Sequence, residues 1–214
     1  PVIEEEVADT SYSLTDELES NKQYYWKVTA INDIGETTCK TIYRFTTINP
    51  NYANIWYDDF ENNYNTGDLP SNEHYETSIG ENSTICIDVK DGRKSVKFLK
   101  GNDGTLLTLT KAFENADDIL LEMKFWVRNN GHFILMSGET QVFRFYFRGN
   151  SLSYYKSSDY VSIGTYKLYQ WNSLRIETNL KAKIYSVYLN GELVSDSVPM
   201  ERSANFFNGI KFST

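Results

Sequence analysis

The chain has 214 residues and a formal net charge of −8 at pH 7, with 21 Lys and Arg residues against 29 Asp and Glu residues. This acidic balance argues against nucleic acid as a partner, because phosphate binding needs an excess of Lys and Arg. Hydrophobic residues make up 40% and aromatic residues 15% of the sequence, which is typical of a globular protein rather than a disordered one. No apolar run approaches the ~20 residues of a membrane span.

The first 48 residues carry a spaced set of apolar side chains ahead of a turn. The spacing is L-x5-Y-x-W-x-V-x-A, formed by Leu18, Tyr24, Trp26, Val28 and Ala30. Asn32 and Gly35 follow in a turn. The whole pattern resembles the second half of a fibronectin type III domain. The resemblance implies half of an immunoglobulin-like sandwich over residues 1–48. The earlier strands of that family are missing, and the chain begins at Pro1 without Met, so we expect a fragment of a longer protein.

A short polar stretch with a proline, residues 48–51, is expected to link this half-domain to the next unit. From residue 52 onward the pattern is one of short strands and turns, with strong hairpin signals at Asp91-Gly92 and Asn190-Gly191. Many short strands at this spacing predict a β-sandwich or barrel. The expected strands cover residues 83–89, 95–99, 106–110, 119–127, 133–136, 143–148, 151–155, 174–178, 184–189 and 210–212.

The second unit also has a recognisable ending. Trp171-x-x-Leu174-x-Ile176, a polar turn and then Tyr185-x-Val187-x-Leu189-Asn190-Gly191 resemble the endings of concanavalin A-like and laminin-G-like jelly rolls. The DDFE run at residues 58–61 is common where such modules are attached to secreted bacterial polysaccharidases. The resemblance implies an antiparallel jelly-roll β-sandwich over residues 52–214, without its final strand. It also implies a secreted or cell-surface location, linked to catalytic or other modules.

The hairpin between Val142 and Tyr155 has a two-residue period on both strands. If Gly149-Asn150 forms the turn, paired residues share a face. One face then carries the core residues Phe143, Phe145, Phe147, Leu152 and Tyr154. The other face carries Arg144, Tyr146, Arg148, Ser153 and Tyr155.

The same alternation in residues 121–128 places Trp126 and Arg128 on an outer face, together with Glu122 and Lys124. We expect this face to join the outer face of the hairpin in one binding surface, with Asp159 and Tyr160 from a neighbouring loop. Aromatic rings stack on the C–H faces of sugars, and Arg donates paired hydrogen bonds. The expected partner is therefore a polysaccharide. An excess of cations favours a uronate-containing polymer, whereas the resemblance also includes fructan-binding modules.

Two other interpretations of these residues stay open. Arg and Tyr on the outside of a sheet are often a solvated face without a ligand. The site is otherwise expected in loops that carry Asp159, Tyr160, Tyr166 and Tyr169. Trp171 is expected to be a core or rim residue.

The sequence offers little for catalysis. It lacks the E-x-D-x-(x)-E run of jelly-roll glucanases, and His74 and His132 stand in loop-like contexts without a nucleophile signature. We therefore expect a non-catalytic carbohydrate-binding module with no catalytic residue. The alternatives are a laminin-G-like adhesion module, and a glycoside hydrolase or polysaccharide lyase whose acids are not recognised.

No cofactor is expected, but a structural calcium ion is possible. Asp58 and Asp59 are candidate ligands, because calcium takes carboxylates in loops; the other interpretation is that both are solvated acids. Cys39 and Cys86 have no zinc-ligand spacing, and a disulfide between them stays open.

Overall fold

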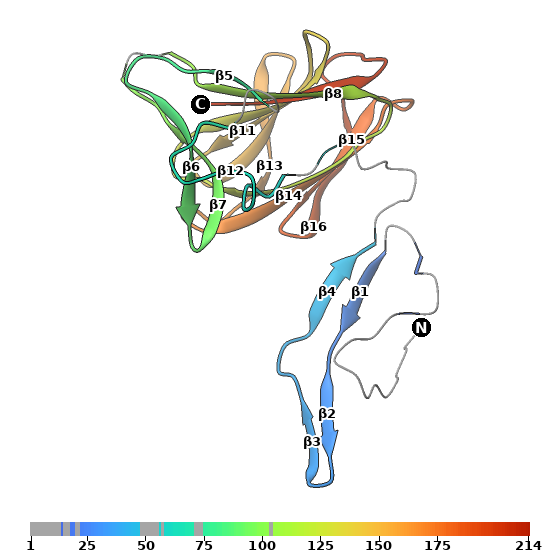
Figure 1. The fold of residues 1–214 in the computed structure, drawn as a ribbon. Helices are drawn as coiled ribbons and strands as arrows, with labels where there is room; N and C mark the ends of the chain where they lie inside the picture. Colours follow the sequence, from blue (N-terminus) through green and yellow to red (C-terminus); the bar gives the residue numbers. More distant parts are fainter. Residues whose placement is uncertain are drawn as a thin grey trace. The chain divides into compact units, whose positions relative to one another are not determined.

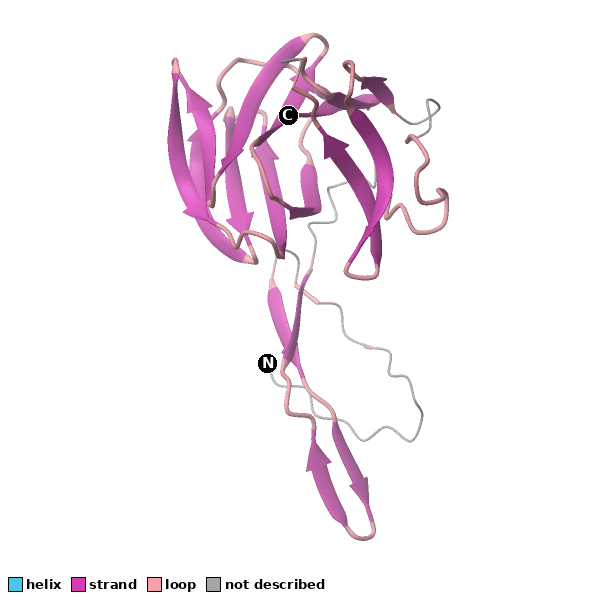
Figure 2. Ribbon diagram, turned by 90° about the vertical axis from the view of Figure 1, so that its left-hand side faces the viewer, coloured by secondary structure: helices cyan, strands magenta, loops and turns pink. Residues whose placement is uncertain are grey.

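A computed structural model describes residues 14, 18–19, 22–47, 56, 58–70, 75–102 and 105–214. Every regular element within these residues is a β-strand (Figure 2). The chain forms two compact units, Pro1–Ala53 and Asn54–Thr214. In the described part of the chain there is no helix long and apolar enough to cross a membrane. The linker expected at residues 48–51 and His74 both lie outside the described residues.

Unit 1 contains two pairs of antiparallel strands. They are β1 (Gln23–Trp26) with β4 (Tyr43–Thr46), and β2 (Thr29–Asn32) with β3 (Gly35–Thr38). In the expected turn, the side-chain oxygen of Asn32 accepts hydrogen bonds from the backbone N–H groups of Ile34 and Gly35. Trp26 stacks on Tyr43 with 4.6 Å between ring centroids. The fibronectin identity of this unit stays a prediction.

Unit 2 is an antiparallel β-sandwich with jelly-roll crossovers (Figure 1), which confirms the predicted fold class. One layer has seven strands in the order β13-β12-β11-β10-β17-β8-β5. Their bounds are β5 (Glu76–Ser78), β8 (Thr108–Ala116), β10 (Gly131–Ser137), β11 (Thr140–Arg148), β12 (Ser151–Lys156), β13 (Asp159–Thr165) and β17 (Phe207–Ser213).

The other layer has four strands in the order β16-β15-β14-β9. They are β9 (Leu120–Trp126), β14 (Trp171–Asn179), β15 (Ile184–Leu189) and β16 (Glu192–Pro199). A separate hairpin, β6 (Thr84–Lys90) and β7 (Arg93–Leu99), packs Ile87 against Leu109 of β8 in a second apolar cluster. This hairpin therefore covers part of the seven-stranded sheet that the four-stranded sheet leaves open.

The main core lies between the two layers. Phe143 and Phe145 of β11 pack on Tyr185 of β15, with ring centroids 4.4 and 5.6 Å apart, and Phe147 packs on Phe125 of β9 at 4.9 Å. All five rings belong to one buried cluster. Their two-residue spacing along β11 is what a strand with one buried face requires, so the predicted inward face of the hairpin is confirmed.

The register of the central hairpin is also as predicted. The pairs are Phe145–Tyr154, Tyr146–Ser153, Phe147–Leu152 and Arg148–Ser151. The turn begins at Gly149, which has a φ of 56°, a conformation that glycine adopts without steric cost. Because paired residues share a face, Arg144 and Tyr146 point away from the core.

In unit 2, the strands β5 and β13 were not expected from the sequence, and β16 was implied only by the hairpin signal at Asn190-Gly191. Residues 157–166 were expected to form a loop; they contain three serines, an aspartate and a glycine, which are typical turn formers. Instead β13 pairs with β12 through a register shift between Leu152 and Ser153. The edge strand β13 thereby adds Tyr160 to the seven-stranded sheet.

The calcium site at Asp58 and Asp59 stays a prediction, and both carboxylates accept hydrogen bonds within the protein. Asp58 accepts hydrogen bonds from the backbone N–H of Phe60 and from the hydroxyls of Tyr64 and Tyr75. Asp59 accepts one from the backbone N–H of Glu61. No group of three or more metal-ligating side chains occurs among the described residues. Asp58 thus has a structural role, because it accepts hydrogen bonds from two buried tyrosines.

Asp58→Ala is therefore expected to destabilise unit 2, because it leaves the hydroxyl of buried Tyr75 without its acceptor. The loss should be about 1–3 kcal/mol in urea unfolding, whereas a calcium chelator should leave wild-type unfolding unchanged. A chelator effect as large as that of the mutation would instead establish a calcium site.

Candidate functional site

The outer face of the seven-stranded sheet carries a group of aromatic and cationic side chains that we call the ring cluster. It consists of His132, Arg144, Tyr146, Tyr155 and Tyr160, from the four consecutive strands β10 to β13. His132 pairs with Tyr146 across β10 and β11, and Tyr155 pairs with Tyr160 across β12 and β13. Cross-strand partners share a face, which is why residues far apart in the sequence meet here.

The rings of this cluster form a continuous series. His132 stacks on Tyr146 at 4.5 Å between centroids with only 11° between the ring planes. Tyr146 lies 4.9 Å from Tyr160, which lies 5.2 Å from Tyr155. Each ring is half-buried by its neighbours. The cluster is thus a packed aromatic surface that still faces solvent.

Arg144 is the cation of the cluster. Its guanidinium carbon lies 4.1 Å from the Tyr155 ring centroid and 5.9 Å from that of Tyr160, within cation–π range. Its Nε is buried without a hydrogen-bond partner among the described residues, and no carboxylate there forms an ion pair with it. Among the described residues, the guanidinium thus has aromatic neighbours and no ion-pair partner.

His132 and Tyr160 titrate differently from exposed groups. Burial lowers the pKa of His132, and the positive charges of Arg144 and Lys100 lower it further. Burial raises the pKa of Tyr160, although Arg144 opposes this. The Tyr160 hydroxyl lies 3.3 Å from Nε2 of His132. At neutral pH the histidine is thus an uncharged imidazole in contact with a protonated phenol.

The pKa of His132 predicts a pH dependence of stability. An unfolded histidine binds its proton near pH 6.5, whereas folded His132 binds it only at a lower pH. Between these values the unfolded state holds more protons, so stability should fall as the pH falls through 6.5 and level off below the folded pKa. Urea unfolding of wild type and His132→Gln at pH 5 to 8 tests this: the difference between the curves should shrink at acid pH. Parallel curves would contradict it.

A cavity of about 410 Å³ adjoins the cluster at the β12–β13 turn. Tyr155 belongs to both, and Glu201, from the segment between β16 and β17, lines the other side. One carboxylate oxygen of Glu201 is buried without a hydrogen-bond partner in the described part of the chain. The complete lining is Tyr154, Tyr155, Lys156, Ser157, Ser158, Pro199, Met200, Glu201 and Arg202. The cavity thus offers several polar groups beside an aromatic ring.

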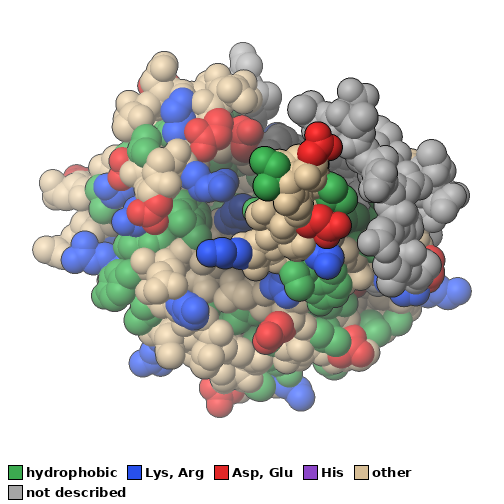
Figure 3. Space-filling view, turned by 90° about the horizontal axis from the view of Figure 1, so that it is seen from below, with side chains coloured by type: hydrophobic (Ala, Val, Ile, Leu, Met, Phe, Trp, Pro, Cys, Tyr) green, Lys and Arg blue, Asp and Glu red, His purple; other side chains and the backbone are tan. Residues whose placement is uncertain are grey.

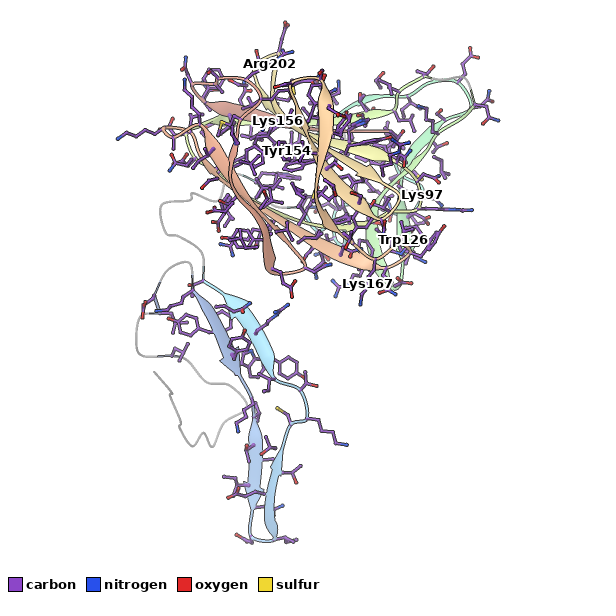
Figure 4. All side chains as sticks on the ribbon, turned by 180° about the vertical axis from the view of Figure 1, so that it is seen from behind. Lys97, Trp126, Tyr154, Lys156, Lys167 and Arg202 are labelled. Atoms are coloured by element: carbon purple, nitrogen blue, oxygen red, sulfur yellow. The ribbon has the colours of Figure 1, made fainter. Side chains whose placement is uncertain are left out.

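The expected single surface does not form, because Trp126 lies on the opposite side of the sandwich and Arg128 lies in the loop between the two sheets. Trp126 ends β9 in the four-stranded sheet, and Arg128 follows it in the loop to β10. The alternation within β9 is as predicted, since Phe125 points into the core. The outer faces of two packed sheets point in opposite directions, however. In Figure 4 Trp126 lies far from Tyr154, Lys156 and Arg202.

The other expected residues are also divided. Arg148 is exposed at the end of β11, on the ring-cluster side of the strand. Asp159 pairs with Lys156 at the β12–β13 turn, one position before Tyr160. Its side chain therefore lies on the other face of the strand, outside the ring cluster. The residues of the alternative loop site lie in different places: Tyr166 is buried against Phe125, whereas Tyr169 packs on Trp126.

His132 is the member of the cluster that the sequence interpretation missed. It was expected in a loop, but β10 begins at Gly131 and places it in a strand. Phe133 and Leu135 are buried, and His132 alternates with them. Ile134 between them is buried as well, so the sequence shows no clean alternation here and carried no signal that His132 lies in a strand.

Comparisons with known proteins concern the fold. No family model matches the sequence, and no curated protein matches it significantly. Among solved structures, a sialidase superposes with a TM-score of 0.59 at 7% identity, covering 66% of this chain but only 13% of the sialidase. The superposition with an alginate lyase of polysaccharide lyase family 7 covers 67% of this chain and 80% of the lyase chain at 10% identity, but its TM-score is 0.29. That superposition is too loose for any inference. The sialidase likeness shows a shared β-sandwich fold in a chain that spans a small part of that protein.

Proposed function

We propose that unit 2 binds an acidic polysaccharide on the outer face of its seven-stranded sheet, without cleaving it. The observation that carries the proposal is Arg144, whose guanidinium lies against Tyr155 and has no acceptor among the described residues. A planar guanidinium held by a ring is well placed to bind a carboxylate through two parallel hydrogen bonds. Uronic acids supply that carboxylate, whereas neutral fructans do not.

The rest of the surface fits the other parts of a sugar. Tyrosine rings offer flat apolar faces for the C–H side of a pyranose and a hydroxyl at the rim. In the adjoining cavity, the Glu201 carboxylate and the hydroxyls of Ser157 and Ser158 are suited to hydrogen bonds with sugar hydroxyls. A polymer that crosses both regions would bind Arg144 through a carboxylate and the cavity beside Tyr155 through its hydroxyl groups.

The wider context is part of the same proposal. A fold shared with part of a protein named sialidase supports a role among modules of carbohydrate-active proteins. We take unit 2 to be such a module in a longer secreted or cell-surface protein, which it holds on its polymer. Figure 3 shows Lys and Arg side chains interspersed with Asp and Glu side chains on one face of the molecule.

Affinity electrophoresis of the complete chain tests the proposal. Gels contain pectate, alginate, neutral levan or no polymer. We expect retardation in at least one polyuronate gel at low salt and none in levan. Equal mobility in all gels would overturn polysaccharide binding and favour the adhesion alternative. Retardation by levan alone would overturn the acidic ligand.

A second candidate function is favoured by one contact, that between the neutral imidazole of His132 and the hydroxyl of Tyr160 near Arg144. These groups suit β-elimination in a polyuronate. Arg144 would neutralise the uronate carboxylate, a base of the pair would take the adjacent carbon-bound proton, and an acid would protonate the departing glycosidic oxygen as a C=C bond forms. Ultraviolet-absorbing unsaturated product from pectate or alginate, lost in His132→Gln, would replace the binding proposal with this one.

A further inference from the structure

We infer that unit 2 has a second saccharide-binding surface, on the outer face of the four-stranded sheet, for an acidic sugar chain. We call it the tryptophan surface. It consists of Trp126 and Lys124 of β9, Trp171 and Ser173 of β14, and Arg93 of β7. It lies on the opposite side of the sandwich from the ring cluster and shares no residue with it.

The strand register brings these residues together. Trp126 pairs with Trp171, and Lys124 pairs with Ser173, across the antiparallel β9–β14 pair. Between them along the strands lie Phe125 and Asn172, whose side chains are buried. The four paired side chains therefore stand side by side on the outer face. Two neighbouring tryptophans are unusual on the outer face of a sheet, where polar residues are more common.

The surface contains a cavity of about 310 Å³. This is at the lower end of the ~300–1,000 Å³ found for small-molecule sites, which suits a few atoms of one sugar residue at a time. Arg93 and Lys124 provide cations, Trp171 provides a ring, and asparagines provide the polar floor. The lining is Arg93, Lys124, Trp171, Asn172, Ser173 and Asn190.

A hydrogen-bond network fixes the floor of this cavity. The buried side chain of Asn172 donates to the carbonyls of Lys167 and Gln170 and accepts from the backbone N–H of Lys167. It also accepts from the Asn190 side chain at 3.0 Å, and Asn190 in turn accepts from the backbone N–H of Ser173 at 2.9 Å. A floor held in this way needs little reorganisation when a ligand binds, which favours binding.

The charges around the tryptophans select the ligand class. The Lys90 ammonium lies 4.7 Å from the Trp126 ring centroid, and Arg93 and Lys124 line the cavity. The nearby Asp91 offsets Lys90 only in part, as an exposed ion pair at 3.6 Å. Figure 4 shows Lys167 on the same side as Trp126. In a chain of net charge −8, this local excess of cations favours a carboxylate-bearing sugar over a neutral one.

The indole nitrogens indicate how the tryptophans act. Nε1 of Trp126 and Nε1 of Trp171 are both buried without a hydrogen-bond partner among the described residues. The rings are thus held by packing, including the edge contact of Trp126 with Tyr169 at 5.8 Å. What they offer a ligand is carbon surface, the surface on which sugar rings stack.

Two surfaces on opposite sides of one sandwich do not form a continuous groove. One module would then hold two polymer chains, or two distant segments of one chain. Simultaneous weak binding at both surfaces raises the overall affinity for one polymer network above the affinity of either surface alone. It also cross-links the polymer. The second surface stands on its own residues and does not depend on the proposed role of Arg144.

Calorimetric titration of the complete chain with oligogalacturonate tests this inference. Wild type should bind about two oligosaccharides per chain, and Trp171→Ala should bind about one. Because a tryptophan change can disturb folding, Arg93→Ser/Lys124→Ser provides a second variant that alters only surface cations; it should weaken the same site by at least about tenfold. Lys181→Ala, a cation on the β14–β15 turn, should leave both sites intact.

The outcomes separate the two surfaces. A stoichiometry of two that falls to one in the Trp171 or double variant, with the remaining site lost on Arg144→Ala, supports both. Binding that survives Arg144→Ala but is lost in the Trp171 and double variants supports the tryptophan surface and contradicts the ring cluster. Unchanged stoichiometry and affinity in correctly folded Trp171→Ala and in the double variant would overturn the second surface.

Discussion

Phe143→Ala is expected to lower the free energy of unfolding of unit 2 by about 3–5 kcal/mol. Phe143 is only 1% exposed and lies at the centre of the layer interface. Its ring lies 4.4 Å from that of Tyr185 and 5.5 Å from that of Phe145. Truncation removes both contacts and leaves a cavity between two sheets that cannot close around it.

Urea unfolding monitored by tryptophan fluorescence measures this loss. The control is Leu193→Ala in β16, because this leucine is 52% exposed and should cost no more than about 0.5 kcal/mol. A Phe143 variant as stable as the Leu193 variant would mean that the two layers do not pack as described.

Arg144→Ala is expected to weaken binding of a polyuronate at the ring cluster by about 10- to 100-fold. This is the loss of affinity expected when one charge-assisted hydrogen bond is removed. The physical reason is the loss of the one guanidinium that lies against Tyr155 without an acceptor among the described residues. Arg144→Lys keeps the charge but loses the planar fork and the stacking, so it should recover only part of the affinity.

Affinity electrophoresis at several polymer concentrations measures both variants in a Trp171→Ala background, so that only the ring cluster binds, with Lys181→Ala as the control that removes the same charge elsewhere. Unfolding by urea should show that the Arg144 variants remain folded, since the side chain lies outside the core. Full affinity in Arg144→Ala would remove the acidic-ligand proposal for this face. Equal affinity of Arg144→Lys and wild type would mean that only net charge matters.

The two-residue period was sufficient to predict much of the fold. Phe143, Phe145 and Phe147 alternate with polar residues, and a strand with one buried face leaves a single register that buries all three. The Gly149-Asn150 turn then determined which residues of β12 face the same way. Local pattern and tertiary packing agree here, so the pattern was a reliable guide.

The two-residue period could not predict which of the two sheets each strand joins. It correctly placed Trp126 outside the core and Phe125 inside, yet nothing in the alternation of β9 says which layer the strand joins. That is decided by crossover connections, which leave β9 beside β14 and remote from β11. Trp126 and Arg144 therefore occupy opposite sides of the sandwich. The predicted binding surface is divided into two smaller ones.

The candidate site was predictable only in part. Arg144, Tyr146 and Tyr155 follow from the hairpin alone, but Tyr160 depends on β13, whose turn-forming residues do not resemble a strand. His132 depends on where β10 begins. Strand ends are where local sequence carries the weakest signal, because pairing with a neighbour decides them. The Glu201 carboxylate comes from a connection between sheets and had no sequence signal.

A titration of isotope-labelled protein with oligogalacturonate, followed by backbone amide NMR, tests the central claim most directly. Trp171→Ala should be used, so that only the ring cluster remains to bind. We predict that the largest shift changes map to β10 to β13 around Arg144 and Tyr155, and that they vanish in Trp171→Ala/Arg144→Ala. Saturable shift changes confined to other strands, or none at millimolar oligosaccharide, would contradict a saccharide-binding face on the seven-stranded sheet.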